Sequence, residues 1–156
     1  MRRFNNTIIG QFFGHTHNDE FEIFYGNKSE VRSDKFAEAA ILTKPKSPPM
    51  LQGSSAVNVA YLAPSLTPHK GVNPAYRIYE IAAAENSSSD AVVVDHETHY
   101  VDLAASILNG SLVHKFGYSA RAEYNMSDLS PESWETVVTS AATKGPEGDR
   151  IFQHFK

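Results

Sequence analysis

The sequence predicts an α/β protein in which about five strands are followed by helices. Short apolar and aromatic runs dominate the first two thirds of the chain, and helical spacing replaces them in the last third. With 156 residues, 41% hydrophobic residues and no cysteine, the chain has the size of one domain without disulfides. Its net charge of −4 lacks the basic excess of a nucleic-acid-binding protein, so nucleic acid is not an expected partner.

The strands are predicted from short runs that end at Gly, Asn or Pro. They span residues 7–13, 21–25, 58–62, 75–81 and 91–103. Because little helix separates them, the sheet is expected to be antiparallel or mixed, and the first two strands can pair. A short helix is predicted at 33–42, inside a loop insertion at roughly 30–55 that is rich in proline at its end.

Two helices are predicted in the last third of the chain. Apolar residues recur at intervals of four over 112–124, which predicts a helix there. A second helix is predicted over 131–143, with Ser130 as N-cap, Pro131 at the first position and Gly145 after its end. Its apolar face comprises Trp134, Val137, Val138, Ala141 and Ala142. We therefore divide the chain into a sheet-rich part, 1–105, and a C-terminal helical region, 106–156.

The pattern that points most directly to chemistry is Gly14-His15-Thr16-His17, which follows the first strand. In an extended chain, residues two apart point to the same side, roughly 6.6 Å apart, so both imidazoles can face one cleft. Imidazole suits zinc, and paired hydrolytic metal ions lie about 3.5–4 Å apart, so His15 and His17 can each bind a different ion. The alternative is a pair of histidines on an exposed strand end.

Neighbouring acidic and histidine residues allow further interpretations. Asp19 and Glu20 can orient the imidazoles as hydrogen-bond acceptors, although a solvated charged turn is the favoured interpretation. His96 and His99 are three residues apart in a β-like segment, so they should face opposite sides of a strand. We interpret them as polar residues on a strand edge rather than as metal ligands.

Five segments together resemble the acid sphingomyelinases, a family of calcineurin-like metallophosphoesterases. In the order that the family has them, these are residues 10–21 (GQFFGHTHNDEF), 59–65 (VAYLAPS), 73–79 (NPAYRIY), 95–98 (DHET) and 128–131 (DLSP). The resemblance runs roughly from Arg3 to Phe155 and so covers most of the chain.

This resemblance implies that the strands are the C-terminal part of a metallophosphoesterase β-sandwich, followed by C-terminal helices. It implies zinc-dependent hydrolysis of sphingomyelin, or of a related phosphodiester lipid, to ceramide and phosphocholine, with His15 on one Zn²⁺ and His17 on the other. It also implies a secreted or lysosomal glycoprotein with a glycan on Asn86 and only transient contact with a membrane surface. His69 stands where the family commonly has an aromatic residue near the substrate head group. It can replace that residue as a polar contact, but an exposed loop histidine is the favoured interpretation.

The chain also departs from the family. The family's other metal ligands come from an Asp-x-His, a Gly-Asp-x-x-Asp, a Gly-Asn-His and a further histidine upstream, and this sequence contains none of these motifs. Because each zinc ion wants about four ligands, two histidines cannot hold two ions. We therefore expect the C-terminal piece of an enzyme whose signal peptide is not in this chain, inactive when isolated. The alternative is a non-catalytic binding or regulatory fragment or isoform.

Overall fold

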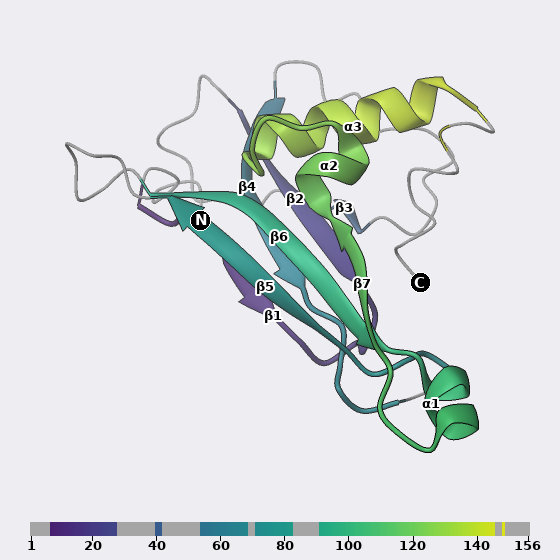
Figure 1. Ribbon diagram of the computed structural model, residues 1–156. Helices are drawn as coiled ribbons and strands as arrows, with labels where there is room; N and C mark the ends of the chain where they lie inside the picture. Colours follow the sequence, from purple (N-terminus) through teal and green to yellow (C-terminus); the bar gives the residue numbers. More distant parts are fainter. Residues whose placement is uncertain are drawn as a thin grey trace.

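The computed structural model describes residues 7–27, 40–41, 54–68, 71–82, 91–145 and 148. Within these ranges the chain forms seven strands and three helices (Figure 1). Their bounds are β1 (Gln11–Phe13), β2 (Glu20–Asn27), β3 (Ala40–Ile41), β4 (Ser54–Leu62), β5 (Ala75–Ala82), β6 (Val92–Val101), α1 (Leu103–Asn109), β7 (His114–Ser119), α2 (Ala120–Tyr124) and α3 (Pro131–Thr143). In these described ranges, no helix has the length and apolar character needed to cross a membrane.

The strands form two sheets, one mixed and one antiparallel. The first sheet has the order β1-β4-β2-β3, with β1 parallel to β4 and β2 antiparallel to both β4 and β3. The second sheet has the order β5-β6-β7 and is antiparallel throughout. The predicted fold class, an α/β fold with mixed or antiparallel strands followed by helices, is confirmed. β1 and β2 do not pair with each other, because β4 lies between them.

The two sheets face each other across an aromatic core. Tyr79 of β5 contacts Phe12 of β1 and Tyr61 of β4, at ring-centroid distances of 4.6 and 5.7 Å. α3 packs against β4 and β2 and crosses one end of the first sheet (Figure 1). The buried cluster draws on both sheets and on the helical region: Phe21, Ile23, Ala56, Val59, Tyr61, Val93, Tyr118, Ala120, Leu129, Trp134 and Val138.

α3 has the bounds that the sequence predicts. Ser130 is its N-cap, with a side-chain oxygen that accepts a hydrogen bond from the Ser133 backbone N–H, and Pro131 occupies the first turn. The helix buries Trp134, Val137, Val138 and Ala141, while Ala142 is exposed. Burying a large apolar side chain contributes about 1.5–3 kcal/mol each, so this face holds the helix on the sheets.

The predicted helix over 112–124 is wrong. Residues 114–119 form β7, which pairs with β6, and only Ala120–Tyr124 is helical. Gly117 permits the close pairing, because a Cβ at this position would lie 2.8 Å from the Thr98 carbonyl oxygen. Ser119 then caps α2 by accepting a hydrogen bond from the Ala122 N–H.

Other boundaries also differ from the prediction. β1 is limited to Gln11–Phe13, and β6 ends at Val101 because Asp102 caps α1, a helix that the sequence analysis missed. Most of the predicted helix at 33–42 and of the loop insertion at 30–55 lies outside the described residues. Ala40–Ile41 is described and is a strand paired with β2, so the helix is wrong at these two residues. The division at residue 105 stays a prediction.

Candidate functional site

The Gly14-His15-Thr16-His17 segment lies in the loop between β1 and β2. β1 runs parallel to β4 and β2 runs antiparallel to it on the other side, so the loop must reverse the chain across the end of β4. His15 and His17 accommodate this reversal with positive φ values of 95° and 67°. The segment is therefore not extended as predicted, because the sheet order forces a turn here.

A cavity of about 180 Å³ adjoins this loop. It is lined by His17, Asp19, Pro64, Val72, Asn73, Ala75, Thr98, Tyr100, Gly117 and Tyr118. His17 is half-buried in its wall, whereas His15 is exposed and is not among the lining residues. The cavity thus combines an imidazole from the loop with hydroxyl and amide groups from the second sheet and its connections.

The donor chemistry of the loop suits zinc, but the number of donors does not. Imidazole nitrogen is a preferred zinc ligand, and each ion wants about four ligands. Among the described residues, no group of three or more His, Asp or Glu side chains lies close enough to hold a metal ion. The described part of the chain can therefore supply ligands to a zinc site but does not complete one, and the predicted pair of zinc ions stays a prediction.

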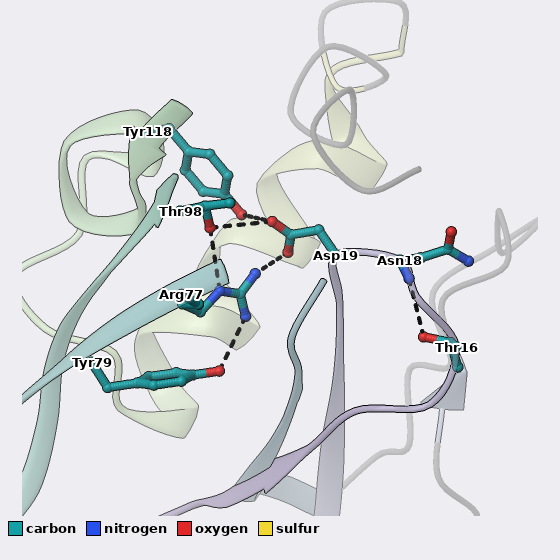
Figure 2. Close-up of polar contacts among 7 residues, drawn as sticks. All are labelled: Thr16, Asn18, Asp19, Arg77, Tyr79, Thr98 and Tyr118. Atoms are coloured by element: carbon teal, nitrogen blue, oxygen red, sulfur yellow. Dashed lines mark hydrogen bonds and ion pairs between the residues drawn. The ribbon is translucent and has the colours of Figure 1, made fainter. Parts of the chain in front are cut away.

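Asp19, two residues after His17, forms a buried ion pair with Arg77 of β5 (Figure 2). Its other carboxylate oxygen accepts hydrogen bonds from the Tyr118 hydroxyl at 2.8 Å and the Thr98 hydroxyl at 3.3 Å. Arg77 also donates from Nε to Thr98 Oγ1 and from Nη1 to the Tyr79 hydroxyl, each at 3.3 Å. The carboxylate therefore contacts all three strands of the second sheet.

Burial and charge fix the protonation of Arg77 and Tyr118. Burial by itself would lower the pKa of Arg77, but the negative charge of Asp19 and the neighbouring tyrosines raise that pKa above its ordinary value. Burial, followed by the charge of Asp19, raises the pKa of Tyr118. Arg77 therefore stays a cation and Tyr118 stays a neutral hydrogen-bond donor at physiological pH.

The favoured interpretation of Asp19 as part of a solvated charged turn is wrong, because its side chain is only 8% exposed. Arg77 is not among the residues predicted for the site. A signal was present in β5, where Arg77 shares the inward side with Ala75 and Tyr79 while Ile78 points outward and is 54% exposed. A charged residue on the buried side of an alternating strand calls for a buried partner.

His96 and His99 face opposite sides of β6, as predicted. His96 is 1% exposed and its ring lies among those of Tyr61, Tyr79, Tyr118 and Trp134. His99 stacks on Tyr76 and contacts a Glu97 carboxylate oxygen at 3.1 Å. Their assignment to a strand edge is wrong, because β6 is the central strand of its sheet.

Two further predicted residues, His69 and Asn86, lie outside the described residues, so their predicted roles in head-group contact and glycosylation stay predictions.

Known proteins are similar in sequence to this chain over most of its length. The chain is 37% identical to sphingomyelin phosphodiesterase from Bos taurus over 139 residues, which cover 88% of this chain and 18% of that protein. It is 34% identical to sphingomyelin phosphodiesterase 1 from Caenorhabditis elegans over 154 residues, which cover 99% of this chain and 23% of that protein. These sphingomyelin phosphodiesterases are homologues of the chain over most of its length.

The chain spans only about a fifth of the length of these two relatives, 18% and 23%. It is also 26% identical over 161 aligned positions to the cyclic GMP-AMP phosphodiesterase SMPDL3A from Mus musculus, covering 99% of this chain and 29% of that protein. No protein-family model matches the chain. The resemblance to acid sphingomyelinases is confirmed, while the metallophosphoesterase assignment stays a prediction.

Proposed function

We propose that this chain is part of a zinc-dependent phosphodiesterase that hydrolyses sphingomyelin to ceramide and phosphocholine. The observation that carries the proposal is the 34–37% identity to sphingomyelin phosphodiesterases over 88–99% of the chain. In this proposal the chain contributes the Gly14-His15-Thr16-His17 segment, with His15 as a ligand of one zinc ion and His17 as a ligand of the other.

The structure supports the proposal through the position of this segment. The loop leaves the end of a sheet, where backbone is free to turn, and places His17 in the wall of a cavity. The ions, when bound, would supply positive charge that stabilises the oxygens of a phosphodiester. The residues of this chain would hold and orient the zinc ions. The remaining ligands would come from beyond the described residues.

A second phosphodiester substrate has a specific observation in its favour. A relative named as a cyclic GMP-AMP phosphodiesterase matches 99% of the chain, at 26% identity. The higher identity to the sphingomyelin enzymes favours the lipid.

The same proposal places the longer protein in a secreted or lysosomal compartment, where it would meet a membrane surface transiently.

The test uses the longer protein that contains this chain. We expect His17→Ala to remove bound zinc and to lower the release of phosphocholine from sphingomyelin by at least about a hundredfold, as for loss of a group needed in the transition state. His114→Ala, at an exposed position of β7, is the matched control and should retain both. Wild-type turnover by His17→Ala would end the proposal.

The isolated chain provides a second arm. Because two imidazoles cannot hold two zinc ions, it should show no phosphodiesterase activity towards sphingomyelin or cyclic GMP-AMP and only weak zinc affinity by calorimetry. Hydrolysis by the purified chain would show that its site is complete. Absence of activity in the longer protein as well would favour the non-catalytic alternative.

A further inference from the structure

We propose that Arg77 is a positioning residue for His17: by pairing with Asp19 it holds the end of the β1–β2 loop against the second sheet. The catalytic consequence of this inference rests on the proposed function, whereas the effect on the position of His17 rests on the geometry alone. The three-strand network around Asp19 (Figure 2) carries the inference.

Both ends of the loop continue into strands of the first sheet, and the second sheet adds a side-chain anchor at Asp19. At its start, β1 pairs with β4, and the Ala63 N–H extends this pairing by donating to the Phe13 carbonyl at 2.8 Å. At its end, Asp19 is tied to residues of the second sheet that are 58, 79 and 99 positions away in the sequence. His17 therefore lies between an anchor on one sheet and an anchor on the other.

The anchor at Asp19 is rigid for a physical reason. The Arg77 side chain is 1% exposed and the Asp19 side chain 8%, so water does not compete for these contacts. Arg77 uses separate nitrogens for Asp19, Thr98 and Tyr79, and this planar arrangement leaves the guanidinium one orientation. A lysine would keep the charge but not the divided contacts.

The anchor and His17 also share the cavity. His17, Asp19, Thr98 and Tyr118 all line it, so the hydrogen bonds to Asp19 set the distance between the loop side of the cavity and the sheet side. Loss of the pair would let the loop move relative to that wall. The strained positive φ of His17 makes relaxation of the loop favourable once the anchor is lost.

The experiment must separate positioning from stability. Removing one partner of a buried pair leaves an unpaired buried charge, so the decisive variant is the double change Asp19→Asn with Arg77→Met, which leaves neither charge. Arg77→Lys is the conservative variant. Lys115→Met is the matched control, because it breaks the exposed Lys115–Asp102 pair at the far end of β7.

The first readout is the NMR signal of the His17 ring in the zinc-free 156-residue chain, assigned with His17→Gln and compared with the His114 ring as an internal reference. We expect the His17 signals to shift and broaden in the double variant and to shift less in Arg77→Lys, while Lys115→Met leaves them unchanged. Urea unfolding shows in parallel that each variant is folded. If the double variant does not fold, the shift in Arg77→Lys carries the test.

The second readout is turnover of sphingomyelin by the longer protein. A displaced ligand should lower kcat by about 10- to 100-fold with little change in KM, and Arg77→Lys should be intermediate. The proposal would be overturned if the double variant is folded and has wild-type His17 signals. If the double variant does not fold, the same result in a folded Arg77→Lys would overturn it. If the signals move but His17→Ala keeps full activity, the proposed function fails and the positioning role of Arg77 stands.

Discussion

The fold is expected to lose stability in mild acid because of His96. The ring is enclosed by Tyr61, Tyr79, Tyr118 and Trp134, and its Nδ1 is buried without a hydrogen-bond partner among the described residues. The charged group that acts on it is Arg77, whose positive charge disfavours a second cation. A proton on this imidazole therefore has neither water nor a carboxylate to stabilise it.

The size of the effect follows from the difference between folded and unfolded states. Burial, reinforced by the Arg77 charge, lowers the pKa of His96 to about 2, while an unfolded chain takes up the proton near its ordinary value of 6.5. Below pH 6.5 the unfolded state binds more protons, so stability falls with falling pH until about pH 2. Between pH 8 and pH 5 the expected loss in the free energy of unfolding is about 2 kcal/mol.

Equilibrium urea unfolding at pH 8 and pH 5, followed by far-UV circular dichroism, measures this loss. His96→Phe keeps an aromatic ring in the enclosure and removes the titrating group, so its loss between the two pH values should be smaller by about 2 kcal/mol. His114→Phe makes the same chemical change at an exposed position and should retain the wild-type loss. An equal loss in His96→Phe and wild type would refute the reasoning.

Substitutions at three further positions test local features by the same unfolding measurement. Ser130→Ala removes the hydrogen bond from the Ser133 N–H and should cost about 1 kcal/mol; no change would mean that solvent replaces the cap. Gly117→Ala places a Cβ 2.8 Å from the Thr98 carbonyl oxygen and should cost about 1–3 kcal/mol through displaced backbone, so a neutral result would contradict the close pairing. Because the φ of His15 is positive, the His15→Gly variant should have a free energy of unfolding about 1 kcal/mol higher than that of His15→Ala. The reverse order would show that the turn is relaxed.

Elements with local signals were predictable from the sequence. α3 is specified by Ser130 and Pro131 at its start and by Gly145, which has a φ of 57° just beyond its end. These residues act within one turn of the helix terminus, so no distant contact is needed to place it. β2, β4, β5 and β6 were also found, because aromatic and β-branched residues mark a half-buried strand.

β7 was not predictable in the same way. The interval of four between Phe116 and Ala120 is helical, but strand pairing with β6 overrides it. Phe116 is 56% exposed and so does not fill the helix face that the spacing implied. α1 was missed because the predicted strand was extended to residue 103. Leu103 and Ile107 are four residues apart in this helix, but the helix buries no residue.

The candidate site was likewise predictable only where its sequence signal is local. The Gly14-His15-Thr16-His17 motif is contiguous, so its presence could be predicted from the sequence. Its turn could not be predicted, because the turn results from the position of β4 between β1 and β2. The pair of Asp19 and Arg77 joins residues 58 positions apart, and no spacing rule connects them. Only the inward position of Arg77 in β5 indicated a buried partner.

Trp134 is the single tryptophan of the chain and has no exposed surface. Its ring stacks near that of His96, at a centroid distance of 6.4 Å, and lies where α3 meets both sheets. Its fluorescence emission should therefore be that of an indole shielded from water, and should move to longer wavelength when α3 lifts away. The protein thus contains a native optical probe of its core, which needs no label and reports the exposure of the Trp134 indole to water.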